Sequence, residues 1–308
     1  MCCTIGEVET HLTNTRIYVG EAMKNDKLVH VLAYQNKAES ANGVPNAMIL
    51  PFPTSQKMGQ DNVLNTEKYK DFLDNITDAS QRHTKSARRS LGVDSVDFDL
   101  DERAEVFDVG SYTVILAEHV SQVPEALNRV AIEKRPKVSR SFLAGFAELY
   151  PNQPVALCCW AGGQVLPEPL LWWYEPTDPE NLFIPTMDAH DGGPPNLDAM
   201  VDTDHIISVG SAMHPMGSPV SYRIGYVESR LPTHAASLLP TRVYGHRPGY
   251  RSKNGDSFVS VANLRSSTKT GLYTAGTGVM IKRGVRLHKA TTSPLVTHSE
   301  QRMDGWIA

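Results

Sequence analysis

Short apolar runs rich in β-branched and aromatic residues recur along the chain, and they constrain the fold more than any other feature. Two of them, 15–22 and 27–38, flank the polar segment MKNDK and predict a β-hairpin. Two others, 47–53 and 182–186, end in prolines, which stop a strand because proline has no backbone N–H to donate. We therefore expect a β-rich core in which the two proline-ended strands lie side by side in one sheet.

Three segments show helical spacing of apolar residues instead. In the first, Tyr69, Phe72, Leu73 and Ile76 lie on one helical face, and the helix is expected to begin near Thr66. The predicted helical segments are 65–85, 123–133 and 139–151.

The remaining periodic segments are short and extended. The predicted strands are 111–119, 154–162, 169–176, 206–209, 256–264, 271–275 and 278–288. This pattern predicts an α+β fold: a mixed or antiparallel β-sheet with a few helices in a core domain, 1–210, and a β-rich C-terminal extension, 211–308, packed on that core.

The composition is that of an ordinary globular protein, with 308 residues and a formal net charge of −4. This charge gives no bulk attraction to nucleic acid or to an anionic membrane. No apolar run has the length of a membrane span, and the N-terminus lacks the basic start and apolar core of a secretory signal. Four cysteines form no disulfide framework in a chain of this length, so we expect a soluble cytoplasmic protein with reduced thiols.

The cysteines form two adjacent pairs, Cys2–Cys3 and Cys158–Cys159. Neighbouring residues of a strand point to opposite faces, so neither pair is suited to give two ligands to one zinc ion. Cys158 and Cys159 lie in an apolar run, and we predict that they are buried structural thiols that react slowly.

The order of several pieces resembles that of the DUF2330-type family over residues 1–190. The matching pieces are Cys3, TRIYVGEA, LVHVLAYQN, NAMILPFP, YTVILAEHVSQVPEAL, FLAGFAELYP, PVALCCWAG and LFIPTMD. The chain differs from the family in having no export signal and in its C-terminal third. The resemblance implies a β-rich α+β fold and indicates little about chemistry.

Cys2 is a candidate catalytic nucleophile. Removal of Met1 would leave a free α-amino group on Cys2, and this group can act as a base for the thiol of the same residue. The arrangement resembles N-terminal-nucleophile hydrolases such as choloylglycine hydrolases and glutamine amidotransferases. It implies an amide hydrolase in which Arg16 or Glu21 orients the substrate. The second strand, IYVGEAM, lacks the G-R-x-x-D pattern of those enzymes.

A second set of candidates lies in the polar stretch between two apolar runs. Asp188, His190, Asp204 and His205 are ligand types for zinc, iron or manganese, but their spacing matches no metal motif. We predict instead a rim loop, reversed by the sequence GGPP, in which the Asp and His side chains bond mainly to backbone groups. A metal-dependent enzyme is the alternative.

A third set could contact a partner. Trp172 and Trp173 lie on opposite faces of a strand, so one is expected in the core and the other at the surface. A glycine-rich segment near residue 250 carries basic and aromatic side chains that can hold a phosphate or an acidic partner. The candidate binding residues are Trp173, Arg247, Tyr250, Arg251 and Lys253.

No complete catalytic set is evident, and no G-x-S-x-G motif occurs. We therefore predict a non-catalytic protein that binds a protein partner or assembles with itself, without a cofactor, a membrane or nucleic acid. The amide hydrolase using Cys2 and the metal-dependent enzyme at His190 and His205 are the alternatives.

Overall fold

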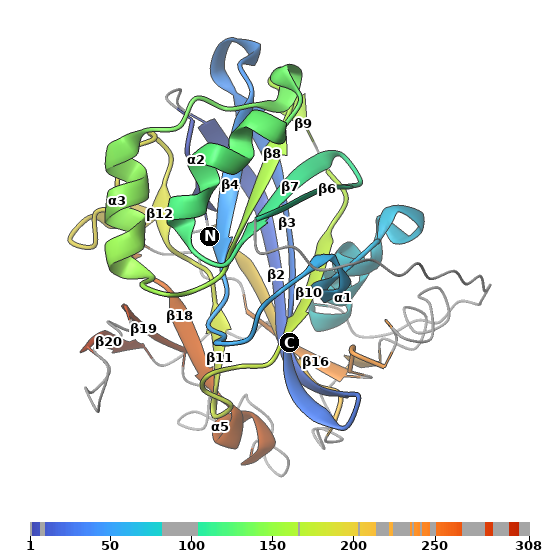
Figure 1. The fold of residues 1–308 in the computed structure, drawn as a ribbon. Coiled ribbons are helices and arrows are strands. Elements are labelled where there is room, and N and C mark those ends of the chain that lie inside the picture. Colours follow the sequence, from blue (N-terminus) through green and yellow to red (C-terminus); the bar gives the residue numbers. More distant parts are fainter. Residues whose placement is uncertain are drawn as a thin grey trace.

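The structure is a computed structural model (Figure 1). It describes residues 2–6, 10–81, 104–165, 167–202, 204–213, 222–223, 235, 237–240, 242–246, 251–266, 281–285 and 296–301. A few short helices accompany mixed and antiparallel β-sheets, so the fold is α+β as predicted.

An eight-stranded sheet contains the order β15-β16-β14-β2-β3-β10-β5, and β9 pairs with β3 off this path. Its strands are β2 (Thr10–Lys24), β3 (Lys27–Ser40), β5 (Val63–Leu64), β9 (Gln164–Val165), β10 (Leu170–Tyr174), β14 (Ile206–Ser211), β15 (Tyr222–Arg223) and β16 (Arg242–His246). All neighbouring strands are antiparallel except β14 and β2, which are parallel.

The predicted hairpin is confirmed as β2 and β3, the long pair through the centre of Figure 1. Pairing runs from Lys24 opposite Lys27 out to Thr10 opposite Ser40. The two turn residues, Asn25 and Asp26, both have positive φ, which is the backbone of a type I′ turn. Asn and Asp adopt this conformation more readily than other non-glycine residues, so the local sequence fixes this turn and the register of the pair.

The two proline-ended strands lie in different sheets, so the prediction that they are neighbours was wrong. β4 (Asn46–Pro51) belongs to the order β4-β8-β7-β6, with β8 (Val155–Trp160), β7 (Tyr112–Ala117) and β6 (Glu105–Val109). β11 (Asn181–Ile184) belongs to the order β11-β18-β19-β20, with β18 (Ser257–Ser260), β19 (Ile281–Val285) and β20 (Val296–Gln301). A proline removes a hydrogen-bond donor and so ends a strand, but it does not select the neighbour.

Two further sheets have two strands each. β1 (Cys2–Cys3) pairs with β12 (Asp188–Ala189), and β13 (Met200–Asp202) pairs with β17 (Arg251–Lys253). Because β11 pairs with β18, and β14 with β16, strands from both sides of residue 210 share sheets. The division into domains at that residue stays a prediction.

The predicted helix at 139–151 is present as α3 (Arg140–Leu149), where the Ser139 hydroxyl accepts a hydrogen bond from the backbone N–H of Phe142. α1 (Phe72–Gln81) begins later than expected. The segment 256–264, expected to be a strand, changes from β18 to α5 (Val261–Ser266). The short 3₁₀ turns are η1 (Ala41–Gly43), η2 (Gln60–Asn62), η3 (Glu67–Tyr69), η4 (Val120–Gln122), η5 (Leu127–Arg129) and η6 (Ile132–Lys134).

The helix expected over 123–133 is much shorter. Only α2 (Val123–Ala126) is α-helical, and η5 ends where Val130 is extended. The Arg135 guanidinium donates to the carbonyl oxygens of Asn128 and Val130, so these groups are satisfied without a continuing helix.

The core lies on both faces of the central hairpin. The larger cluster includes Tyr34 and Phe52, and on the other face Phe72 of α1 packs in a second cluster with Tyr18. Cys158 and Cys159 are fully buried in β8, as predicted, and burial raises the pKa of both thiols. No helix in the described part of the chain is long and apolar enough to cross a membrane.

His30 gives the fold a specific pH dependence. It is buried on β3, and burial lowers its pKa from 6.5 to about 4. In the unfolded chain His30 has its ordinary pKa of 6.5, so it binds a proton at a higher pH than the buried residue does. The contribution of His30 to stability is therefore complete above about pH 6.5 and is lost as the pH falls toward 4. We expect this residue to account for a loss of about 2 to 3 kcal/mol between neutral pH and about pH 4.5.

Urea unfolding of the wild type and of His30→Gln across this range tests the expectation. The variant should lose less stability on acidification, whereas His11→Gln, at an exposed histidine, should behave as the wild type. Equal pH dependence of the wild type and His30→Gln would show that His30 is not responsible.

Candidate functional site

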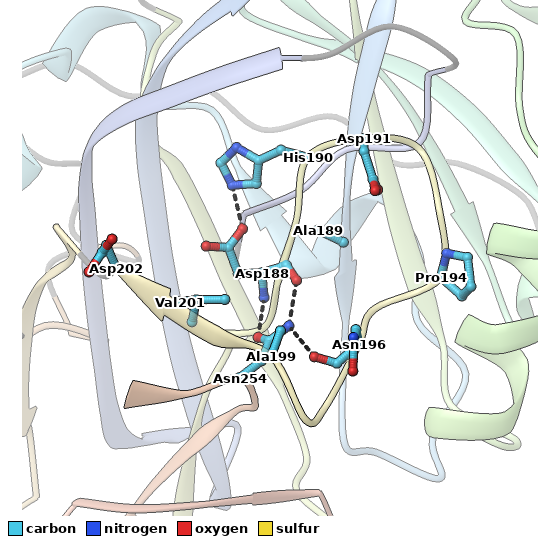
Figure 2. A pocket seen from close by; sticks show the side chains of 10 residues that line it. All are labelled: Asp188, Ala189, His190, Asp191, Pro194, Asn196, Ala199, Val201, Asp202 and Asn254. Carbon is cyan, nitrogen blue, oxygen red and sulfur yellow. Dashed lines mark hydrogen bonds and ion pairs between the residues drawn. The ribbon is translucent and has the colours of Figure 1, made fainter. Parts of the chain in front are cut away.

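A pocket of about 610 Å³ lies between β12 and β13 (Figure 2). Two segments supply most of its wall, and one residue that follows β17 supplies the rest. The lining residues are Asp188, Ala189, His190, Asp191, Pro194, Asn196, Ala199, Val201, Asp202 and Asn254.

The N-terminal strand holds one wall of the pocket. β1 runs parallel to β12, with Cys2 opposite Asp188, and the backbone N–H of Thr4 donates to the carbonyl oxygen of Ala189 at 2.9 Å. The N–H of Thr10 donates to the carbonyl oxygen of His190 at 3.2 Å. Segments far apart in the sequence therefore fix the backbone of this wall.

The side chain of Asn254 bonds to the backbone of β12 as a neighbouring strand would. Its Oδ1 accepts from the backbone N–H of Asp188 at 2.8 Å, and its Nδ2 donates to the Asp188 carbonyl oxygen at 2.6 Å. The same Nδ2 donates to the carbonyl oxygen of Asn196 at 3.1 Å. The backbone N–H of Asn254 donates to the carbonyl oxygen of Ala199 at 2.9 Å. One buried side chain thus sets the spacing between the two segments that line the pocket (Figure 2).

Beneath Asn254, a buried carboxylate anchors the same region. Asp256 Oδ1 accepts from the backbone N–H groups of Thr186 and Met187 at 2.9 and 3.0 Å, and the Tyr150 hydroxyl donates to Oδ2. Burial raises the pKa of Asp256, and the hydrogen bonds act in the opposite direction by favouring its charged form. Asp256 therefore joins the end of α3 to the segment between β11 and β12.

The rim of the pocket rests on α3. A side chain at Gly145 would place its Cβ 2.6 Å from Cβ of Pro194. The helix can approach the turn this closely only because Gly145 has no Cβ. The turn itself is closed by Asp191, whose Oδ1 accepts from the N–H of Gly193 at 2.9 Å, and by Asn196, whose Oδ1 accepts from that of Asp198 at 2.9 Å.

His190 is held between two acceptors. Its Nδ1 is 2.9 Å from the carbonyl oxygen of Thr10, and its Nε2 is 2.5 Å from Oδ1 of Asp188. The contact between His190 and Asp188 is an ion pair only when the imidazole ring is protonated.

The candidates for N-terminal-nucleophile catalysis are separated. Cys2 lies beside the pocket on β1, whereas Arg16 and Glu21 lie on β2 and have other contacts. Nη2 of Arg16 pairs with Asp74 of α1 at 2.6 Å, and the buried Glu21 accepts from the Ser211 hydroxyl at 2.8 Å. The structure does not bring these two residues to Cys2 as a set.

The four candidate metal ligands are also divided. Asp188 and His190 line the pocket, whereas Asp204 accepts from the backbone N–H of Asn14 at 3.0 Å and His205 is buried beside β14. Across the described ranges, no group of three or more His, Cys, Asp or Glu side chains could hold a metal ion.

The candidate binding residues lie in two places. Trp172 is buried, as expected for one of the two tryptophans. Trp173 is half-buried, and its Nε1 donates to the carbonyl oxygen of Asp61 at 2.7 Å. Nζ of Lys24 lies 4.7 Å from the ring centroid of Trp173. Arg251 and Lys253 lie on β17, where Lys253 pairs with Asp198 at 3.2 Å. Arg247 and Tyr250 lie outside the described residues.

Sequence reasoning missed Asn254, Asp256 and Asp202. The only sequence signal for the first two was the short motif NGD at the end of the basic segment, which reads as an ordinary turn. Their roles depend on contacts about seventy residues away in the chain, which no local pattern encodes.

Comparison with known proteins adds one likeness. No protein-family model and no curated protein matches the chain. Among solved structures, the crystal structure of baculovirus P35 is similar over 67% of this chain and 67% of that chain, with 15% sequence identity and a TM-score of 0.39. This likeness is too slight to support any argument about function, so that argument must come from the residues of this chain.

Asn254 gives the site a direct test. Asn254→Ala would leave the N–H and the carbonyl oxygen of Asp188 without these partners, and we expect the free energy of unfolding to fall by about 2 to 4 kcal/mol. The matched control is Asn196→Ala, which removes a single exposed hydrogen bond and should cost less than about 1 kcal/mol. Urea unfolding measures both, and equal losses would contradict the assigned role of Asn254.

Proposed function

We propose that the protein is a non-catalytic binding protein and that the pocket between β12 and β13 receives a segment of a protein partner. The observation that carries the proposal is a pocket whose backbone is fixed by buried groups while exposed side chains remain at its mouth. Asn254 and Asp256 hold the walls, and the lining residues Asp191, Asn196 and Asp202 are exposed. A preformed site of this kind loses little conformational freedom on binding.

The polar groups of the pocket are better suited to binding than to catalysis. Both ring nitrogens of His190 face acceptors, so the ring is not placed to take a proton from a substrate. The described lining includes no serine, cysteine or lysine that could serve as a nucleophile beside it.

An amide hydrolase is the second candidate, and one observation favours it. β1 places Cys2 opposite Asp188, at the edge of the pocket. This register would bring an N-terminal nucleophile to the same site. The two candidates differ in whether Cys2 is required.

Photo-crosslinking from Asn196 tests the binding function. The side chain of Asn196 is exposed and lines the pocket, so a benzophenone amino acid there should capture whatever occupies the pocket. In extract of the source cells, we expect one discrete crosslinked partner, or a second copy of the chain. The control is the same amino acid at Ile132, 80% exposed on η6, which should not capture that species.

Two results would count against the proposal. Capture that is equal at both positions, or absent at both, would show that the pocket does not define a binding site. Capture at Asn196 that disappears in Cys2→Ser, with release of a cleaved product by the wild type, would make the hydrolase the better assignment.

A further inference from the structure

Thr10, the first residue of β2, holds His190 at the wall of the pocket. The backbone N–H of Thr10 donates to the carbonyl oxygen of His190 at 3.2 Å, and the carbonyl oxygen of Thr10 lies 2.9 Å from Nδ1 of the His190 ring. A carbonyl oxygen can only accept, so Nδ1 carries the proton in this bond. One residue of the central sheet therefore fixes both the backbone and the ring of a residue that lines the pocket.

Thr10 is held in turn by Asn46, the first residue of β4. The side chain of Asn46 is fully buried, and its Nδ2 donates to the Thr10 hydroxyl at 2.5 Å. Its Oδ1 accepts from the backbone N–H groups of Gly6 and Ala47 at 2.8 and 2.7 Å. Because a buried polar group without a partner is costly, these three bonds together hold the carboxamide in one position.

The chain packs closely around this carboxamide. A Cβ at Gly6 would lie 2.6 Å from Oδ1 of Asn46, so the backbone can pass at this distance only as glycine. Beside it, the N–H of Ile5 donates to the carbonyl oxygen of Ala47 at 3.0 Å. The segment that supports β12 through β1 is therefore also bonded to β4, in the sheet β4-β8-β7-β6.

Neither Asn46 nor Thr10 lines the pocket, yet their hydrogen bonds form a continuous path from β4 to His190. We propose that Asn46 is a positioning residue of the pocket: by holding Thr10, it sets the place and the ring orientation of His190. The end strand β4 of the second sheet thereby controls one wall of the site. This inference goes beyond the proposed function, because it assigns what shapes the pocket whatever the pocket binds.

NMR of the His190 ring tests the path. The ¹⁵N chemical shift of Nδ1, measured through the carbon-bound ring protons, reports whether this nitrogen keeps its proton and its hydrogen bond. Thr10→Val removes the hydroxyl that Asn46 holds and leaves Nδ2 of Asn46 without that acceptor, so we expect the Nδ1 resonance of His190 to shift. Thr10→Ser restores a hydroxyl and should keep the wild-type shift.

The matched control is Thr113→Val, the same substitution on β7 of the second sheet. The Thr113 hydroxyl donates to Oδ1 of Asp108 at 2.6 Å, so this variant also loses a side-chain hydrogen bond. It should lower the free energy of unfolding and leave the Nδ1 resonance of His190 unchanged. A positioning role is separated in this way from a general loss of stability.

Gly6→Ala reaches Asn46 from its other side and leaves Thr10 intact. The added methyl group would displace the Asn46 carboxamide, so we expect the Nδ1 resonance of His190 to shift here as well. This variant carries the test if Thr10→Val does not fold. An unchanged resonance in either folded variant would overturn the inference. An equal shift in Thr113→Val, or a shift in Thr10→Ser as large as that in Thr10→Val, would overturn it too, because the bond between Asn46 and Thr10 would not be the cause.

Discussion

The buried pair formed by Asn254 and Asp256 is the constraint on which the pocket depends. The two residues are separated only by Gly255 in the short segment between β17 and β18, and together they satisfy the backbone N–H groups of Thr186, Met187 and Asp188. A backbone amide buried without a partner is costly, so these bonds leave the segment between β11 and β12 a single well-defined path. The hydroxyl of Tyr150 then connects that path to α3.

This arrangement separates the groups that build the pocket from those that face its mouth. Asn254, Asp256 and the Asp188–His190 pair are engaged with the protein itself. Asp191 and Asp202 remain exposed beside a short strand edge. The groups that fix the walls are therefore different from the carboxylates that remain exposed in the lining.

Much of the fold could be predicted from sequence, and the failures have a common cause. The hairpin of β2 and β3 followed from alternation and from the turn residues Asn25 and Asp26, whose effect is local. The helix at 123–133 was overestimated because Arg135 offers the carbonyls of the segment an alternative partner. The proline-ended strands were assigned to one sheet, but proline determines where a strand ends and not which strand lies beside it.

For the site, the sequence by itself determined which stretch would be polar, where its turn would lie, and that Asp188 and His190 were candidate functional residues. Only the tertiary structure decided that Asp188 and His190 pair with each other, that His205 is buried away from them, and that Asn254 holds both walls. The physical reason is that strand alternation and turn preferences act over a few residues. The contacts that assemble the pocket join Cys2, Asp188 and Asn254, and they form only when separate sheets pack together.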